Sequence, residues 1–411
     1  MTSKTNQNLF LINILLFSIC FLPISLALSR FISEFILIII TISFLILNFV
    51  NEDSRKYYKS HFFKIFILFY VILIISSSLS ENLSSSIRTS IFYFRFGFLV
   101  IVVQYLLEFE KRFHKYFFYA LGSTLLILSI YTFLQVLVFN NAVDPNRNSG
   151  FFGEELVQGS YFVRFLPIFF GLLFLNKNLK FKNSLLILSI LIGLVIVFLS
   201  GERAALALSV MFLVFILFFY PINLKKKFFS ILILLIFFVS LFSIFDGVKK
   251  RVLTDTYADI FENDKLMIFS YGHQSHFKSA IEMIKKNYLT GIGPRNFRIE
   301  CLKKDYEHIG KYRCSTHPHN TYLEVWSEAG LFSFLIIFTI FIYISTILMK
   351  ITLSKNKNDK IALFFFCLSI FINLFPFIPT GSFFNNWISI LYYLPVGFFL
   401  FENKKLKINK A

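Results

Sequence analysis

The chain has 411 residues, of which 56% are apolar and 19% aromatic, and its mean hydropathy is +0.70. This composition excludes an ordinary soluble domain, and repeated apolar runs near 20 residues indicate a polytopic membrane protein. The formal charge of +18 does not indicate nucleic-acid binding, because the basic residues fall mostly between apolar runs, where they set membrane topology.

Twelve apolar runs predict an all-α fold of about twelve transmembrane helices. Nine predicted helices occupy residues 1–245, a large outer loop occupies 246–321, and three more helices with a short inner tail occupy 322–411. Only Lys4 precedes the first run, so we expect a retained span and not a cleaved signal peptide. The runs cover residues 9–28, 31–50, 62–79, 91–107, 117–138, 161–175, 184–200, 204–221, 228–245, 322–349, 361–379 and 382–401.

The distribution of basic residues supports this count and places both termini inside. The predicted inner segments, from Lys4 to Lys410, hold twenty-one Lys and Arg residues. Basic residues favour the cytoplasmic side of a membrane. One missed helix would move every later basic segment to the opposite side, so the bias supports the number of helices as well as their orientation. The charge is therefore mainly a topology signal. The short outer loops hold only four basic residues, Arg30, Arg88, Arg147 and Arg203.

The large outer loop is predicted to have structure of its own. It contains an apolar pattern at helical spacing beside three lysines, which predicts an amphipathic helix lying at the membrane surface. Gly291 to Pro294 then ends this helix in a turn. Cys301 and Cys314 both lie in this loop, and in an oxidising compartment they can form a disulfide close to His319. The pattern consists of Phe277, Ala280, Ile281, Ile284 and Tyr288 with Lys278, Lys285 and Lys286.

A polar stretch at residues 317–331 interrupts the apolar pattern. Thr321 followed by Glu324 forms a capping box, which predicts that a helix begins at Thr321. His319 and Asn320 then lie just outside a helix N-terminus, whose positive end favours an anion and keeps a nearby imidazole neutral. We therefore expect a neutral base beside an anion site.

Arginines gather on the predicted outer side, whereas lysine dominates inside. Arg95 and Arg164 lie within predicted spans, about one turn below the outer surface. A guanidinium matches two phosphate oxygens, and a charge inside a span is costly, so these side chains predict an anion site at headgroup depth. Structural roles remain open: Arg203 can pair with Glu202, and Arg95 and Arg164 can pair with Glu34.

Metal and nucleotide sites fit the pattern less well. Cys314, His317 and His319 are spaced too tightly for the usual zinc sites, and Cys314 has a better partner in Cys301. Gly291 to Gly293 follows no strand and lacks a third glycine, and nothing resembles a P-loop. We expect no metal and no cofactor, so the energy for a reaction must come with the substrate.

These features together resemble the O-antigen ligase and O-antigen polymerase superfamily of bacterial envelope glycosyltransferases. His319-Asn320, followed after nine residues by Gly330, is similar to the family's histidine motif. Arg203 at the start of a span matches its outer arginine. Twelve spans with a large outer loop before the histidine span match its architecture, so the likeness covers nearly the whole chain.

The resemblance implies a GT-C-type, inverting and metal-independent glycosyltransferase of lipopolysaccharide biosynthesis. Its donor would be a glycan on undecaprenyl pyrophosphate. The acceptor would be a lipid A core sugar in a ligase, or the end of another lipid-linked repeat unit in a polymerase. Transfer would occur at the periplasmic face of the bacterial inner membrane, and we favour a ligase.

The resemblance also assigns roles to residues. His319 would be the general base on the acceptor hydroxyl, and Arg203 would hold the leaving pyrophosphate. A loop arginine would assist, and Arg298 or Arg295 is the candidate, although the family's spacing is not reproduced and either side chain can equally be a solvated charge. His317 either orients His319 or only shapes the turn. The supporting residues are Asn320, Glu324 and Gly330.

Three other functions were weighed. A transporter or flippase would use the outer arginines as a headgroup vestibule, but the chain shows no paired half-chain repeats or broken helices near mid-membrane. A membrane scaffold leaves the arginine bias and the capped histidine unexplained. A protein-glycosylating relative would carry a further soluble domain, whereas this chain ends soon after its last span, with Lys404 to Lys410.

Overall fold

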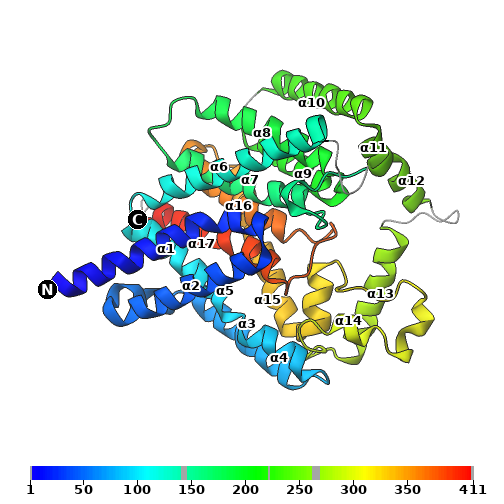
Figure 1. Cartoon of the computed structure of the whole chain (residues 1–411), viewed down its shortest axis with the longest axis horizontal. Helices are drawn as coiled ribbons and strands as arrows, with labels where there is room; N and C mark the ends of the chain where they lie inside the picture. Colours follow the sequence, from blue (N-terminus) through cyan, green and yellow to red (C-terminus); the bar gives the residue numbers. More distant parts are fainter. Residues whose placement is uncertain (1, 140–145, 221–222, 262–268, 409–411) are drawn as a thin grey trace. The chain divides into compact units, whose positions relative to one another are not determined.

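The structure is a computed structural model that describes residues 2–139, 146–220, 223–261 and 269–408. Within these residues the chain consists of helices joined by turns and loops, and no β-strand occurs (Figure 1). The predicted all-α fold class is confirmed for this part of the chain. Residues 262–268 of the predicted outer loop and Lys410 of the predicted tail lie outside the described residues.

Each of the twelve predicted apolar runs coincides with a helix. Among the described residues, nine helical segments are long and apolar enough to cross a membrane, and α9 is shorter, at 17 residues. The count of twelve spans therefore stays a prediction. The helices are α1 (Thr2–Leu28), α2 (Arg30–Val50), α3 (His61–Ser78), α5 (Phe94–Phe109), α6 (Phe113–Leu134), α7 (Gln158–Leu175), α8 (Lys182–Leu199), α9 (Arg203–Phe219), α10 (Leu224–Ile244), α15 (Thr321–Thr352), α16 (Ile361–Asn373) and α17 (Asn386–Ile408).

The helix α16 is shorter than the predicted run at 361–379. It ends at Asn373, after 13 residues, and the chain stays non-helical until α17 begins. Pro376, Pro379 and Gly381 lie in this stretch, and proline lacks the amide hydrogen that a helix needs. The apolar composition of the stretch hid this break, and the resulting segment is part of the site described below.

The chain forms two compact units. The first comprises residues 1–117, 269–345 and 373–411, and the second comprises residues 118–268 and 346–372. In the first unit, α5 packs against α17, where a Cβ on Gly397 would lie 2.6 Å from the Cβ of Val103. The absence of a side chain lets the two helices approach closely. In the second unit, α7 is the most buried membrane-length helix and packs against α8 and α9.

From residue 269 onward, the predicted loop has a hydrophobic core within the first unit, whereas residues 246–261 belong to the second unit, where Val248 packs against Phe198 and Leu199. Helix α13 (Tyr271–Lys286) places Ala280 and Met283 against Phe297, Cys301 and Tyr306. Phe297 begins the short helix α14 (Phe297–Glu300). The loop is thus a packed structure.

A disulfide joins Cys301 to Cys314, whose Cα atoms lie 5.3 Å apart. A helix is present at the predicted amphipathic segment, as α13, and its place at a membrane surface stays a prediction. Its buried face covers the core around this disulfide, whereas Ile281 and Tyr288, predicted on the apolar face, are exposed. The pattern within the helix could not show this partner, because the partner comes from later turns.

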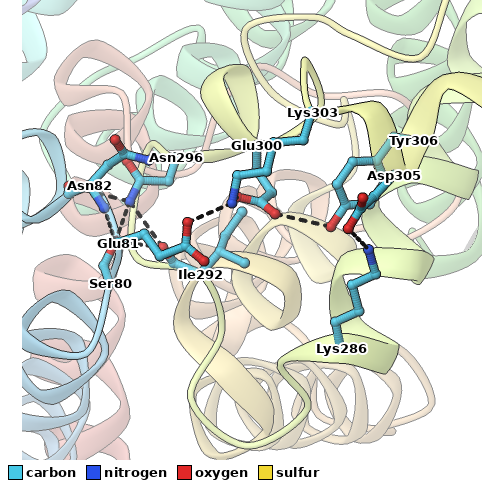
Figure 2. Close-up of polar contacts among 10 residues, drawn as sticks. All are labelled: Ser80, Glu81, Asn82, Lys286, Ile292, Asn296, Glu300, Lys303, Asp305 and Tyr306. Carbon is cyan, nitrogen blue, oxygen red and sulfur yellow. Dashed lines mark hydrogen bonds and ion pairs between the residues drawn. The ribbon is translucent and has the colours of Figure 1, made fainter.

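Polar contacts attach the loop to the turn between α3 and the short helix α4 (Leu83–Ile91), as Figure 2 shows. Ser80 Oγ donates to the carbonyl oxygen of Ile292 at 2.8 Å, and Asn296 Nδ2 donates to Ser80 Oγ at 2.6 Å. Lys303 Nζ lies 2.6 Å from Glu81 Oε2. These contacts between distant parts of the chain fix the turn that carries the loop arginines.

Candidate functional site

The histidine stretch leads into α15, which begins at Thr321, the predicted first residue. The cap differs from the predicted capping box. Asn320 Oδ1 accepts hydrogen bonds from the backbone N–H groups of Tyr322 at 3.0 Å and Leu323 at 3.1 Å. The hydroxyl of Thr321 instead lies 3.1 Å from that of Thr380. The helix start is unchanged because asparagine caps a helix as well as threonine does.

The non-helical segment between α16 and α17 holds both histidines. The backbone N–H of Thr380 donates to the carbonyl oxygen of His319 at 3.0 Å. The Nε2 atom of His317 donates to the carbonyl oxygen of Thr380 at 3.1 Å. One residue of this segment therefore contacts both members of the motif.

Glu324 secures the same segment from α15. Its carboxylate accepts hydrogen bonds from Ser382 Oγ at 2.5 Å and from the backbone N–H of Phe383 at 2.8 Å. The side chain is 1% exposed. Glu324 was predicted to cap the helix, and the structure shows that it anchors the segment that holds the histidines.

Four imidazole rings gather in front of α15. The ring centres of His317 and His319 lie 4.0 Å apart, and those of His273 and His276, both on α13, lie 5.0 and 5.3 Å from His319. His319 has a φ of 58°, in the left-handed region that few non-glycine residues adopt. Such strain persists only where the surroundings enforce it, and it concentrates at functional sites.

Burial lowers the pKa of both motif histidines. It is the largest cause for each, and it takes the pKa of His317 to about 4 and that of His319 to about 2. The hydrogen bond with the backbone of Thr380 partly offsets burial at His317, and the ring of His317 lowers the pKa of His319 further. Both rings are neutral at pH 7 with burial as the largest cause, and the contribution of the helix N-terminus stays a prediction.

Two arginines lie in the turn that follows α13. Glu328, one helical turn after Glu324, accepts hydrogen bonds from the backbone N–H groups of Arg295 at 2.6 Å and Phe297 at 2.8 Å. Burial lowers the pKa of Arg295, and the charge of Arg298 lowers it further. The charge of Arg298 also lowers the pKa of His317.

Gly330 interrupts α15 with a φ of 81°. A Cβ at this position would lie 2.1 Å from the carbonyl oxygen of Leu289. The backbone N–H of Leu331 donates to the carbonyl oxygen of Tyr288 at 3.1 Å. The close backbone approach expected at Gly330 therefore occurs, and it joins α15 to the start of the arginine turn.

The other candidate arginines lie on α5, α7 and α9. Arg95 is on α5 in the first unit, with its guanidinium carbon 5.6 Å from the ring centre of Phe96. Glu34, proposed as its partner, accepts a hydrogen bond from Asn386 Nδ2 at 2.7 Å.

Arg203 and Arg164 belong to the second unit. Arg203 begins α9, and its Nη1 lies 2.5 Å from Asp259 Oδ2. Glu202, the partner considered from the sequence, instead accepts a hydrogen bond from Ser160 Oγ at 2.7 Å. Arg164 Nη1 donates to the carbonyl oxygen of Ser160 at 3.2 Å.

Four residues of this site were not predicted from the sequence. His273 and His276 lie three residues apart on α13, and Glu328 follows Glu324 by four residues on α15, so each pair shares a helical face. These spacings were usable signals. Thr380 had none, because its contacts depend on the break after α16.

Metal-ligating geometry was also considered. In the part of the chain that the structure describes, no group of three or more His, Cys, Asp or Glu side chains has an arrangement that could hold a metal ion. Cys314 is occupied by its disulfide with Cys301.

Comparison with known families gives one match. Residues 188–338 match the family model described as O-antigen ligase. The matched segment runs from α8 into α15, and it includes Arg203, the loop arginines and the histidine stretch. A comparison with curated proteins finds no match.

Proposed function

We propose that this chain, which belongs to the O-antigen ligase superfamily, transfers a glycan from undecaprenyl pyrophosphate to a hydroxyl of a lipid A core sugar. The reaction takes place at the outer face of the bacterial inner membrane. The observation that carries this proposal is the neutral His319, set among imidazoles beside the turn with Arg295 and Arg298. A neutral base next to paired guanidinium groups is what transfer from a pyrophosphate requires.

His319 acts as the general base. Its neutral imidazole takes the proton of the acceptor hydroxyl while the hydroxyl oxygen attacks the anomeric carbon of the donor. The bond between this carbon and the pyrophosphate oxygen breaks, and its electron pair leaves on that oxygen. A single displacement inverts the anomeric configuration, and the proton then passes from the imidazole to water.

Donor binding strengthens this base. The pKa of His319 is about 2 without a ligand, chiefly because the ring is buried. The pyrophosphate brings negative charge beside the imidazole, and a nearby opposite charge stabilises the imidazolium and raises its pKa. The base is therefore stronger when the donor is present.

The arginines bind the departing pyrophosphate. A planar guanidinium matches a pair of phosphate oxygens, and an anion between Arg295 and Arg298 relieves their mutual repulsion. Each preorganised donor at a developing oxyanion contributes on the order of a hundredfold in rate. Arg203 serves as a further pyrophosphate ligand, and Arg95 and Arg164 serve as lipid headgroup contacts.

The test is the substitution His319→Ala. Loss of a general base lowers the rate by on the order of a hundredfold or more, whereas we expect membrane insertion and donor binding to persist. The measurement is the lipopolysaccharide profile of a deletion strain complemented with wild type or His319→Ala. The control is His308→Ala, because His308 lies in the same loop, is exposed and contacts Glu282.

The profile separates the two activities of the superfamily. A ligase is indicated if deletion leaves full-length glycan on undecaprenyl pyrophosphate and bare core on lipid A, and only wild type restores the product. A polymerase is indicated if single repeat units still reach the core while long chains vanish. Wild-type glycan transfer by His319→Ala would overturn the catalytic assignment in either case.

A further inference from the structure

Two buried glutamates on one face of α15 secure two different parts of the site. Glu324 is 1% exposed and Glu328 is 0% exposed, and residues four apart lie one above the other on a helix. Glu324 bonds to Ser382 in the segment that holds the histidines. The side-chain carboxylate of Glu328 bonds to the loop turn that carries Arg295 and Arg298.

Glu328 holds this turn at three points. Its Oε2 accepts from the backbone N–H of Arg295 at 2.6 Å, and its Oε1 accepts from that of Phe297 at 2.8 Å. Its carbonyl oxygen accepts from the backbone N–H of Gly293 at 2.7 Å and from Ser76 Oγ at 2.9 Å. Glu328 thus makes most of the contacts that hold the turn on α15, and the backbone N–H of Ile292 adds one more to the carbonyl oxygen of Ser327 at 2.9 Å.

These contacts account for an unfavourable backbone conformation. Arg295 has a φ of 64°, in the left-handed region that favours glycine. A strained residue persists only where its neighbours fix the chain on both sides. The carboxylate of Glu328 does this on both sides of Asn296, whose Nδ2 is bonded to Ser80 Oγ at 2.6 Å (Figure 2).

The same contacts leave the guanidinium groups for a ligand. Each carboxylate oxygen of Glu328 is engaged by a backbone N–H, so the residue orients the arginines through the backbone. The two cations lie close enough for Arg298 to lower the pKa of Arg295. In the part of the chain that the structure describes, the Nε atom of Arg298 is buried and has no hydrogen-bond partner. Two neighbouring cations with an unused buried donor suit a dianionic or trianionic ligand.

We propose that Glu328 is the positioning residue of a pyrophosphate subsite formed by Arg295 and Arg298. This inference rests on the proposed function, since it names how that function's loop arginines are presented to the donor. Glu328 contacts neither the donor nor the reacting atoms. It sets the backbone from which both guanidinium groups project.

The test measures binding of glycan-free undecaprenyl pyrophosphate to the full-length protein in lipid nanodiscs. Glu328→Gln keeps the size of the side chain but places an amide NH2 against a backbone N–H. We expect this variant to weaken binding about tenfold or more, because at least one of the two backbone hydrogen bonds that fix the turn is lost. The double variant Arg295→Ala/Arg298→Ala is expected to lose at least as much. Adding Glu328→Gln to that double variant should have no further effect, because residues that act as one unit are not additive.

Two matched variants control for general damage. Glu324→Gln alters an equally buried glutamate on the same helix, and it is expected to change the dissociation constant by less than about twofold while lowering kcat. Asp305→Asn alters an exposed carboxylate of the same loop that pairs with Lys286, and it should change neither. If Glu328→Gln does not insert into membranes, Glu328→Asp, which keeps both oxygens on a shorter stem, is judged by the same criteria.

The outcomes separate this inference from the proposed function. The positioning role would be overturned if Glu328→Gln binds the lipid as tightly as wild type does. It would also be overturned if Glu328→Gln weakens binding further in the Arg295→Ala/Arg298→Ala variant. If Glu328→Gln weakens the binding of undecaprenyl monophosphate equally, the assignment to pyrophosphate is overturned. If it weakens the binding of inorganic pyrophosphate in parallel, the assignment is supported. Failure of the proposed function appears instead as glycan transfer by His319→Ala, which does not depend on this binding measurement.

Discussion

The basicity of His319 depends on burial and on the rings around it. A buried neutral imidazole resists protonation, which protects its acceptor nitrogen at ordinary pH but makes it a weak base. In the proposed reaction, the pyrophosphate of the donor would correct this weakness by supplying negative charge. Activity and donor binding would then be coupled at one ring nitrogen.

This coupling predicts a difference between two pH profiles. Protonation removes the base, so activity falls as pH falls through the pKa of His319, which is about 2 in the free protein. The pyrophosphate raises this pKa, so the acid limb of kcat should lie at higher pH than that of kcat/KM. Transfer rates measured between about pH 5 and pH 8, at saturating and at limiting donor, check this. If the acid limbs of kcat and kcat/KM coincide, the pyrophosphate does not lie beside the imidazole.

Helix α15 is divided by Gly330 into two parts with different tasks. The part before Gly330 carries Glu324 and Glu328 and secures the histidine segment and the arginine turn. The part after it continues as a long apolar helix. The close contact with Leu289 at the division couples the loop to the membrane-length helix.

Gly330→Ala should therefore destabilise the loop. The new Cβ would lie 2.1 Å from the carbonyl oxygen of Leu289, and alanine is strained at a φ of 81°. We expect a loss of about 2 kcal/mol or more, measured as a lower Tm in detergent and faster proteolysis of the loop. The control is Gly272→Ala on α13, where a Cβ would have nothing within 4 Å. A Tm for Gly330→Ala equal to that of the control would contradict the close approach.

Sequence patterns predicted elements well where the signal was local. Apolar runs marked each long helix, and the start of α15 at Thr321 followed from polar residues next to it. The patterns failed where partners come from distant segments. Neither the core that covers α13 nor the contacts of Thr380 can be read from neighbouring residues, and the composition after Asn373 concealed a break caused by proline and glycine.

The candidate site divides in the same way. His319, Asn320 and Glu324 were identified as candidates because the motif is contiguous, although Asn320 caps the helix in place of the predicted pair of Thr321 and Glu324. Glu328 and the histidines of α13 were missed because their function depends on a turn and a ring cluster that form only after folding. Contacts between segments, and not local propensity, decide these roles.

For the molecule as a whole, orientation follows from the bias of basic residues. Twenty-one lie on the predicted inner side and four in the short outer loops. Nine helical segments meet the length and hydropathy needed for crossing among the described residues, and the orientation of the loop depends on how the remaining helices insert.

Reporter fusions test this arrangement. Alkaline phosphatase fused after Gly310 should be active, because the loop is expected outside, and green fluorescent protein fused after the last residue should fluoresce, because the tail is expected inside. A reporter fused after Lys180, in a predicted inner segment, gives the internal reference. Phosphatase activity at Lys180 together with none at Gly310 would reverse the predicted orientation.

The disulfide between Cys301 and Cys314 gives the outer loop a dependence on compartment. Protein thiols stay reduced in the cytosol and are oxidised beyond the inner membrane. A chain inserted upside down would keep both thiols, and its loop would lack the covalent link at the centre of its core. The bond is thus a chemical marker of the side of the membrane on which the loop matured.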